Sequence, residues 1–237
     1  MPKASTRRGA ITGLYHANFA IYGFLRASDG TFTTIDPPSS TVSTFPNSIN
    51  STGTIAGSYV DPTFPARNLF HGFLRTADGT FITFDAPGDV FETSVTSIND
   101  LGVIAGYYED PTFVNHGFLR ASDGTLTTFD PPVGSLAAGP QSINSAGAIT
   151  GAYIDATFTF HAYLRGPDGT FNTFENAANG FHGFLRTPDG TITEFNAPGA
   201  AKGTSALSIN SVGTITGFYI DANGVIHGFL RSVPGRH

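Results

Sequence analysis

Apolar and polar residues along the chain alternate in two recurring blocks, each of which predicts a β-hairpin. The first block reads Gly-Phe-Leu-Arg, a short polar link, Asp-Gly-Thr and an apolar run, as in residues 117–129. The second reads Ser-Ile-Asn-x-x-Gly-x-Ile-x-Gly-x-Tyr, as in residues 97–108. Asp-Gly is a strong hairpin signal that predicts positive φ at both central residues, and Asn-x-x-Gly is a second turn signal. Together the two blocks predict four short strands, a to d, in each repeat.

The best-defined repeat places strand a near 93–99, b near 103–108, c near 116–120 and d near 126–130. The link from strand d to the next strand a is the longest and carries Pro-Pro or Ala-Pro-Gly, which suits a step between sheets. One domain over 1–237 is expected, with units near 9–36, 45–85, 93–130, 140–175 and 205–231 and an extra hairpin at 181–196.

Neighbouring apolar residues predict sheets that are buried on both faces. Phe81-Ile82 and Phe73-Leu74 are adjacent apolar pairs, and adjacent residues of a strand point to opposite faces. Sheets stacked face to face around an axis explain this pattern better than a sandwich, which leaves one face of each sheet in water. A β-solenoid is the alternative, but its coils do not need two tight hairpins per repeat. The sequence therefore predicts an all-β fold, a β-propeller of four-stranded antiparallel blades.

The spacing of the repeats is broken once. The arginines that recur in the first block are separated by 49, 45, 45, 21 and 45 residues. The short gap fits either an added hairpin near Phe181–Phe195 or a repeat that lost strands a and b. We expect five blades, because a blade without inner strands would leave a hole beside the axis; six blades with one incomplete blade is the alternative. The first unit lacks a clear strand a, and the last lacks strand d.

Composition narrows the classes of function. Hydrophobic residues make up 40% of the chain and charged residues 13%, which favours a packed core over disorder. A net charge of −6 with 12 Lys+Arg argues against nucleic acid and anionic membranes as partners. The absence of cysteine removes disulfides, thiolate metal sites and cysteine nucleophiles. No membrane span is expected, and no apolar stretch follows the basic segment Met1–Gly9, so no signal peptide is expected within this sequence.

The block His-Gly-Phe-Leu-Arg, with its Ile-Asn-x-x-Gly turn, resembles the bacterial extracellular repeats named HAF for their His-Ala-Phe core. His-Gly-Phe begins at 71, 116, 182 and 227, His-Ala-Tyr at 161 and Tyr-Gly-Phe at 22. The resemblance covers nearly all of the chain, from about Gly9 to Arg231. It implies a secreted or cell-surface β-rich repeat protein, with no enzyme activity and no catalytic residues.

Histidine recurs at one position of the repeat, where the first copy has Tyr22. If this position faced the axis, a ring of imidazoles could bind zinc, copper or iron. Because the position begins strand c, third from the axis if strand a is innermost, we favour structural histidines that bind a backbone or carboxylate group. No cofactor is required. The candidate metal ligands are His71, His116, His161, His182 and His227.

Arginine also recurs in every copy. A carboxylate is available in the same unit at Asp36, Asp85 and Asp130. We expect ion pairs, or guanidinium groups that cap backbone carbonyls between blades, rather than substrate binding. The recurring arginines are Arg26, Arg75, Arg120, Arg165, Arg186 and Arg231.

The loops between strands b and c vary most and are the best candidates for a binding site. Their carboxylates could offer oxygen ligands to calcium, although a turn capped by its own aspartate is favoured. Their phenylalanines would form apolar platforms for a multivalent glycan binder if exposed, but we favour burial between blades. The candidate ligand-binding residues are Asp61, Phe64, Asp110, Phe113, Asp155, Phe158, Asp221 and Asn223.

No known catalytic motif is present. A carboxylate pair across the axis, drawn from Glu92, Glu109, Glu175 and Glu194, could still hydrolyse glycosides. The leading hypothesis is a non-enzymatic, lectin-like propeller that is exported and binds carbohydrate or a surface polymer. The alternatives are a polysaccharide hydrolase or lyase with an axial site, and a structural protein that forms homo-oligomers through its incomplete terminal units.

Overall fold

The computed structural model of the chain describes residues 2–6, 9–37, 43–61, 69–88, 91–131, 135–175, 182–186, 191–209 and 215–232. Every helix or strand assigned in these residues is a β-strand, so the all-β prediction is confirmed. The described part of the chain contains no helix long and apolar enough to cross a membrane. The chain divides into two compact units, Met1–Phe174 and Glu175–His237.

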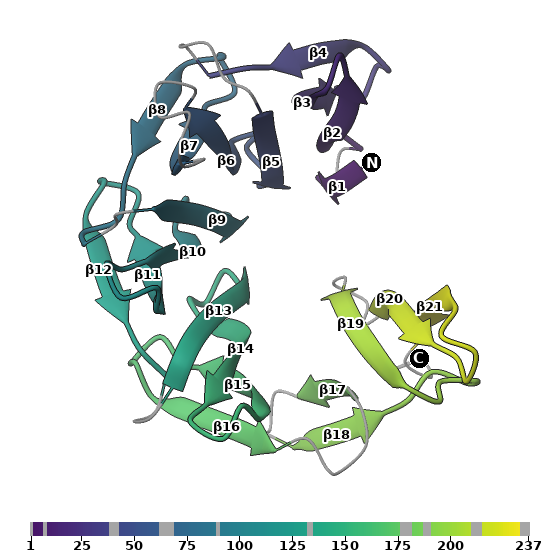
Figure 1. The fold of residues 1–237 in the computed structure, drawn as a ribbon. Coiled ribbons are helices and arrows are strands. Elements are labelled where there is room, and N and C mark those ends of the chain that lie inside the picture. Colours follow the sequence, from purple (N-terminus) through teal and green to yellow (C-terminus); the bar gives the residue numbers. More distant parts are fainter. Residues whose placement is uncertain are drawn as a thin grey trace. The chain divides into compact units, whose positions relative to one another are not determined.

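The first unit is built from four groups of strands that follow one another along the chain (Figure 1). Within each group the strands pair consecutively and antiparallel, in the order a, b, c, d that the sequence predicts. The first two groups are β1 (Pro2–Ser5), β2 (Ile11–Ala17), β3 (Ala20–Arg26) and β4 (Phe32–Ile35), then β5 (Ser43–Ile49), β6 (Ile55–Asp61), β7 (Leu69–Arg75) and β8 (Phe81–Phe84). The next two are β9 (Glu92–Ile98), β10 (Ile104–Glu109), β11 (Asn115–Arg120) and β12 (Leu126–Phe129), then β13 (Ser135–Ile143), β14 (Ile149–Asp155), β15 (Phe160–Arg165) and β16 (Phe171–Glu175).

The first group has a strand a, contrary to the prediction. β1 pairs antiparallel with β2 through Ala4 opposite Thr12 and Ser5 opposite Ile11. The sequence Pro-Lys-Ala-Ser carries no Ser-Ile-Asn block, so the repeat pattern gave no signal for it. The backbone groups of β2 are therefore paired on both sides, by β1 and β3, and β1 is the end strand of this sheet.

Strand a lies on the inner side of each group in the first unit. β1, β5, β9 and β13 contact one another in succession, whereas β4, β8, β12 and β16 lie on the outer side (Figure 1). One parallel pair of residues joins strand c of a group to strand a of the next, as between Phe70 and Glu92. The recurring histidines begin strand c, so they lie away from this inner side.

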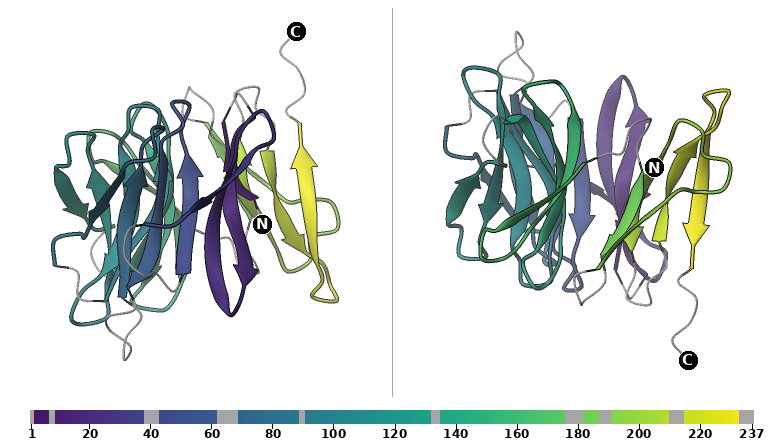
Figure 2. Two further views of the ribbon diagram at one scale, coloured as in Figure 1. Left: turned by 90° about the horizontal axis from the view of Figure 1, so that it is seen from above. Right: turned by 90° about the horizontal axis from the view of Figure 1, so that it is seen from below.

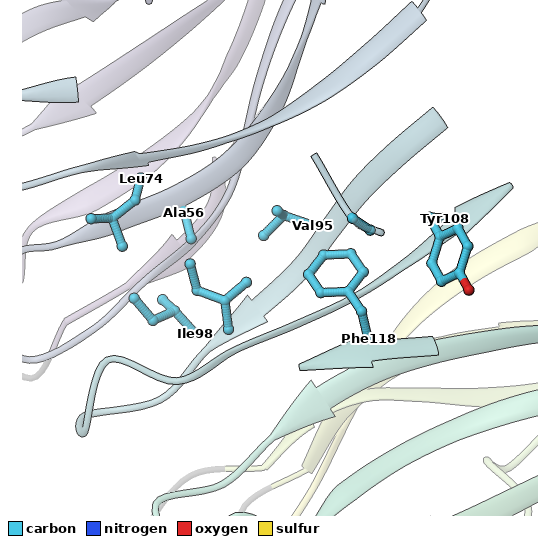
Figure 3. Packing of buried hydrophobic residues seen from close by; sticks show 8 residues of the cluster. Ala56, Leu74, Val95, Ile98, Tyr108 and Phe118 are labelled. Atoms are coloured by element: carbon cyan, nitrogen blue, oxygen red, sulfur yellow. The ribbon is translucent and has the colours of Figure 1, made fainter. Parts of the chain in front are cut away.

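Hydrophobic clusters fill the space between successive groups. Val95, Ile98 and Phe118 of the third group pack against Ala56 and Leu74 of the second (Figure 3). Equivalent clusters lie between the first and second groups and between the third and fourth. Each inner group therefore buries both faces of its sheet, which is why adjacent residues of a strand are both apolar.

The Asp-Gly turns differ from the predicted geometry. Ala121 N donates to Thr125 O at 2.8 Å and Gly124 N donates to Ala121 O at 3.0 Å. Only Gly124 has positive φ, at 94°, while Asp123 accepts a hydrogen bond from Thr125 N at 2.9 Å. This is a type I turn followed by one left-handed residue. The expectation of two positive-φ residues is wrong because the loop has three residues rather than two.

Seen at right angles to Figure 1, the strands of the first unit run side by side between two ends (Figure 2). The a–b turns share one end with the c–d turns: Gly102 lies against Ser122, and Gly147 against Pro167. At the other end, Phe91 of a d–a link stacks on Phe113 of a b–c turn. The b–c turns that the structure describes in this unit therefore project from the end that also carries the d–a links.

The Ser-Ile-Asn block forms a ladder between groups at the a–b end. Asn50 Nδ2 donates to Asn99 O at 3.2 Å, and Asn99 Nδ2 donates to Asn144 O at 3.0 Å. The serine hydroxyls accept backbone N–H groups in the same way, Ser48 from Ile98 at 3.2 Å and Ser97 from Ile143 at 3.3 Å. The block is therefore structural and gives no information on ligands.

Replacing Asn99 by alanine should destabilise the chain by about 1–3 kcal/mol, because buried donors and acceptors lose their partners. Asn99 is buried, and its Oδ1 also accepts Leu101 N at 3.0 Å and Val103 N at 2.9 Å. Urea unfolding followed by circular dichroism measures the change. Asn144→Ala is the matched control, because Asn144 is exposed, and this variant should lose less stability than Asn99→Ala. Equal losses of stability in the two variants would contradict a structural role for the asparagine ladder.

The second unit holds a two-stranded sheet and a three-stranded sheet. The surplus hairpin is β17 (Gly183–Arg186) with β18 (Ile192–Phe195), and the last group is β19 (Gly203–Ile209), β20 (Ile215–Ile220) and β21 (Ile226–Arg231). Phe195 packs edge-on against Phe229 at 6.0 Å, as Phe84 packs against Phe118 at 6.1 Å. Ala197 N donates to Thr204 Oγ1 at 3.0 Å, as Ala86 N donates to Thr93 Oγ1. The hairpin therefore packs on the last group as strands c and d pack on the following group.

Candidate functional site

Two b–c turns hold phenylalanine in a conformation that the described a–b and c–d turns give to glycine. Phe113 has φ 65° and Phe158 has φ 61°. The turn at Phe113 is closed by Asp110 N donating to Val114 O and Phe113 N donating to Asp110 O, each at 3.0 Å, as in the glycine turns. A left-handed backbone is unfavourable by about 1–2 kcal/mol for a residue with a side chain. The glycines at the equivalent place are Gly30, Gly53, Gly79, Gly102, Gly124, Gly147 and Gly169.

The first and last groups differ most from the others at the tip of the b–c turn. In the first group the b–c turn is Asn18-Phe19, with φ 49° and 64°. In the last group the b–c turn has Gly224, with φ 84°. Glycine thus meets the requirement of this turn in one copy and phenylalanine stands there in two, at Phe113 and Phe158. Phe19 has positive φ in a shorter turn of two residues between Ala17 and Ala20.

These phenylalanines are exposed, so the expectation that they are buried is wrong for the two that the structure describes. The exposed fraction is 68% for Phe113 and 77% for Phe158, and Phe19 is fully exposed. The tip of the turn lies beyond the strands, so the rings miss the interfaces between groups. Phe113 has one ring partner, Phe91, stacked at 5.0 Å with planes 4° apart. Phe64 lies outside the described residues.

The loop aspartates organise their own turns. Asp110 Oδ1 accepts Thr112 N at 2.8 Å, the Thr112 hydroxyl at 2.7 Å and Val114 N at 3.0 Å. The hydrogen bonds from Val114 N and the Thr112 hydroxyl hold the pKa of Asp110 well below its usual value. Asp155 makes the same contacts with Thr157 and Thr159.

The last b–c turn follows the same scheme. Asp221 Oδ1 accepts Asn223 N at 2.8 Å and Val225 N at 2.9 Å. Asp61 ends β6 opposite Leu69, and the turn that follows it is not among the described residues. Asp110, Asp155 and Asp221 therefore use their Oδ1 atoms within the turn, as the capped-turn interpretation requires.

The recurring histidines bind carboxylate or amide groups of their own repeat. His116 is stacked on Tyr108 at 5.1 Å, with Nδ1 2.6 Å from Asp130 and Nε2 3.2 Å from Asp110. His71 makes the first of these contacts, with Nδ1 2.7 Å from Asp85. His161 and His227 make the second, with Nε2 2.9 Å from Asp155 and 3.1 Å from Asp221, respectively. His182 Nδ1 lies 2.7 Å from Asn196 Oδ1.

In the first unit, His71, His116 and His161 lie in three different strands c, β7, β11 and β15. In the second unit, His182 comes directly before β17 and His227 lies in β21. Among the described residues, no three histidine, aspartate or glutamate side chains are close enough to hold a metal ion. The contacts link strand c to the b–c turn and to the end of strand d. In the repeats of His116, His161 and His227 the histidine holds the b–c turn in place.

The stability contributed by His116 should fall as pH rises. Burial acts to lower the pKa of His116, but the hydrogen bonds to Asp130 and Asp110 outweigh it, so the pKa is raised above 6.5. A group whose pKa is raised on folding stabilises the protein fully below its unfolded pKa and loses that contribution as pH passes its folded pKa.

His116→Gln should therefore destabilise the chain more at about pH 5.5 than at about pH 8, on the linkage relation. Urea unfolding at both values measures this difference. In an Asp130→Asn background the loss of stability caused by His116→Gln should depend less on pH, because one of the two carboxylates that contact His116 is gone. A loss of stability that is the same at both pH values would contradict the raised pKa of His116.

The recurring arginines whose side chains the structure describes contact aromatic rings, so the predicted ion pairs with Asp85 and Asp130 are wrong. Those carboxylates bind His71 and His116 instead. The guanidinium carbon of Arg120 lies 5.0 Å from the centre of the Phe84 ring, in strand d of the preceding group. Arg165 and Arg231 contact Phe129 and Phe195 at 4.7 and 4.4 Å in the same way. The arginines also reach a carbonyl of their own group, not of the next one, as Arg120 Nη1 does at 3.4 Å from Ala121 O.

Among the candidate glutamates, Glu92 and Glu109 lie opposite each other in β9 and β10. The Ser94 hydroxyl donates to Glu92 Oε1 at 2.7 Å, and Tyr107 OH donates to it at 3.2 Å. Burial raises the pKa of Tyr107. Glu194 is exposed on β18, and the side chain of Glu175 lies outside the described residues.

Sequence reasoning missed Phe19, because its turn lacks the aspartate that marks the other b–c turns. An available signal was the alignment of the b–c turns with Asp221-Ala-Asn-Gly: phenylalanine falls on the glycine position. That alignment marks Phe113 and Phe158 as turn-tip residues rather than as side chains between sheets.

The sequence matches no protein-family model and no curated protein. Its fold is similar to TolB from Acinetobacter baumannii, with 11% identity and a TM-score of 0.59, over 99% of this chain and 54% of the TolB chain. The chain thus spans about half the length of that structure. It is also similar to a catalytically inactive virginiamycin B lyase from Staphylococcus aureus with quinupristin, with 13% identity and a TM-score of 0.55, over 96% of this chain and 83% of the lyase. The chain is therefore an all-β protein with a propeller-like fold.

Proposed function

We propose that this protein is a non-enzymatic binding propeller that recognises carbohydrate or another surface polymer through the tips of its b–c turns. The observation that carries the proposal is the exposed phenylalanine at positive φ, found at Phe19, Phe113 and Phe158. Both the exposed ring and the left-handed backbone oppose folding. Such local strain is typical of functional sites.

The chemistry of these tips suits an apolar, ring-shaped ligand face. An aromatic ring offers a flat apolar surface at a small cost in side-chain entropy. The turn under Phe113 or Phe158 is braced by its aspartate, which is held by His116 or His161 at 3.2 or 2.9 Å. The rings are therefore presented on an ordered support, which favours binding.

Repetition favours a polymer over a single sugar. The same turn occurs at Asp110 and Asp155 in successive groups, and the described b–c turns of the first unit project from one end of the strands. Several weak, equivalent contacts on one chain gain affinity when the ligand repeats along its length. The exported location that the HAF resemblance implies is compatible with a cell-surface or extracellular polymer.

The groups of strands are proposed to be blades of four strands each. Sequence spacing favours five blades with an added hairpin. The packing of the surplus hairpin on the last group, through Phe195 with Phe229 and Ala197 with Thr204, supports the alternative of six blades with one lacking strands a and b. The lyase named above brings no activity to this proposal, since the likeness at 13% identity concerns the fold.

Phe113→Gly and Phe158→Gly should reduce polymer binding without weakening the fold. Glycine relieves the positive φ, so the free energy of unfolding should stay level or rise by up to about 1 kcal/mol. Affinity electrophoresis against xylan, pectin, chitosan and peptidoglycan fragments measures binding. We expect a fall of about tenfold or more for the double variant, because two weak contacts are lost from a multivalent site.

Leu101→Ser is the matched control, because Leu101 is 66% exposed and lies on an a–b turn at the opposite end. It should bind as the unchanged chain does. The proposal fails if the chain binds none of these polymers, or if the glycine variants bind as tightly as the unchanged chain.

A further inference from the structure

Three polar side chains form a row across the third group, where the second, fourth and last groups carry apolar or small residues. Glu92 of β9, Glu109 of β10 and Asn115 of β11 lie directly opposite one another in the antiparallel register. Directly opposite residues of such strands point to the same face, with Cβ atoms about 4.5–5.5 Å apart. The equivalent rows are Ser43-Val60-Phe70, Ala137-Ile154-Phe160 and Gly203-Ile220-Ile226.

The two carboxylates of this row oppose folding, and the repeat does not require them. Like charges directly opposite each other on neighbouring strands destabilise a sheet. Glu92 and Glu109 are both half-buried, so salt screens their repulsion less than it would at the surface. They lie on the face of the third group that turns toward the fourth, as Ala105 and Leu119 do.

Two hydroxyl groups orient the first carboxylate. The Ser94 hydroxyl donates to Glu92 Oε1 at 2.7 Å, and Tyr107 OH donates to the same oxygen at 3.2 Å. Burial raises the pKa of Tyr107, and the charges of Glu92 and Glu109 raise it further, so the phenol remains a neutral donor. Ser94 lies opposite Tyr107, one row further along the same face.

The amide oxygen of Asn115 is a second, independent sign of a ligand. Asn115 Oδ1 is shielded from solvent and accepts no hydrogen bond from any described residue. A shielded carbonyl oxygen without a donor is unfavourable. Because Asn115 lies opposite Glu109, this oxygen belongs to the same row as the two carboxylates. The row is therefore a set of oxygen acceptors that a cation would satisfy.

We propose that Glu92, Glu109 and Asn115 form a calcium-binding site. Carboxylate and amide oxygens are the ligands of hard divalent cations, and calcium accepts about 6–8 oxygens, water among them, in a flexible geometry. Magnesium requires a smaller and more regular octahedron and gives up its water reluctantly, so side chains from three neighbouring strands suit calcium better. A divalent cation balances the two carboxylates and gives Asn115 Oδ1 a partner.

The site lies at the base of the b–c turn that carries Phe113. Glu109 is the last residue of β10 before this turn, and Asn115 is the first residue of β11 after it. Glu92 directly follows Phe91, whose ring stacks on Phe113 at 5.0 Å. Calcium would therefore link both sides of the turn to the strand that follows Phe91. The site does not depend on polymer binding, so its test is independent of the function proposed above.

Isothermal titration calorimetry of the whole chain with calcium chloride, after treatment with EDTA, tests the proposal. We expect one calcium ion per chain with a dissociation constant of about 0.1–1 mM, the range of extracellular calcium modules. Magnesium chloride should bind about tenfold more weakly or less. Saturating calcium should raise the midpoint of thermal unfolding by several degrees, because it binds only the folded chain.

Glu109→Gln should weaken calcium binding about tenfold or more, because one of the two charges is lost. Without calcium this variant should be at least as stable as the unchanged chain, since the repulsion between the carboxylates is gone. A purely structural glutamate would not give both results. Asn115→Leu should also weaken binding and should fold, because the second and fourth groups have Phe70 and Phe160 at this position.

Glu194→Gln is the matched control, since Glu194 is an exposed glutamate on β18. It should bind calcium as the unchanged chain does. The proposal is overturned if the unchanged chain binds no calcium, if it binds magnesium equally well, or if Glu109→Gln binds calcium as tightly as the unchanged chain.

Discussion

Gly117→Leu is expected to disrupt the third group of strands, whereas Gly228→Leu should leave the fold intact. A Cβ at Gly117 would lie 2.4 Å from the Phe129 ring. That ring is held between strands, where it also lies under the Arg165 guanidinium at 4.7 Å. Forcing extra atoms into such packing costs about 1–3 kcal/mol or more. Leucine brings three carbons beyond Cβ, so we expect the upper end of this range or local unfolding.

Thermal unfolding followed by circular dichroism, together with limited proteolysis, measures the effect. Gly117→Leu should lower the midpoint by several degrees or more, and should open the region of β11 and β12 to protease. Gly228→Leu should do neither, since a Cβ there meets only Gly217 O at 4.0 Å. Equal midpoints for the two variants would show that the glycine of the block has no steric role.

Phe118→Ala is expected to cost about 3–5 kcal/mol, the range for removing a buried aromatic side chain. Phe118 is fully buried and packs edge-on against Phe84 of the preceding group at 6.1 Å. It also covers Gly106 of the neighbouring strand. Because each group is stabilised by contacts with its neighbours, the loss should weaken the second and third groups together.

Urea unfolding of Phe118→Ala measures this loss, and amide hydrogen exchange shows which strands open. Phe32→Ala is the control, because Phe32 lies on β4 and is 65% exposed. That variant should stay within about 1 kcal/mol of the unchanged chain, as most exposed substitutions do. A small loss at Phe118, with protection retained in the second group, would contradict the stacked core.

The strands could be predicted from sequence because their residues repeat. In the third group the predicted strands agree with the observed ones to within one residue at each end. Burial on both faces was also visible, since adjacent apolar residues require it. β1 could not be predicted, because its pairing with β2 depends on the backbone and not on a Ser-Ile-Asn block.

The partners of charged residues could not be predicted, since they depend on register across a turn. Asp130 follows β12 and lies beside His116 at 2.6 Å, while Arg120 sits at the other end of β11. Sequence distance offered both pairings. The register of β11 and β12 places His116, not Arg120, beside Asp130. The Arg120 guanidinium carbon instead lies 5.0 Å from the centre of the Phe84 ring.

The loops of the candidate site were identified from their sequence variation, but their conformation was not. Phenylalanine is the most common aromatic residue of this chain and is usually buried in proteins, so burial was a reasonable expectation. The backbone angles show that Phe113 and Phe158 sit at a left-handed turn tip, as their alignment with Gly224 indicates.

The strained, exposed rings of Phe113 and Phe158 are proposed to serve binding rather than folding. Thermal unfolding of the unchanged chain and of the Phe113→Gly, Phe158→Gly double variant, each with and without the polysaccharide that the unchanged chain binds most tightly, is the decisive measurement. We expect the polymer to raise the midpoint of the unchanged chain only, while the variant without polymer is at least as stable. A variant that is less stable without polymer, yet is stabilised by it to the same extent, would show that the rings serve folding and not binding.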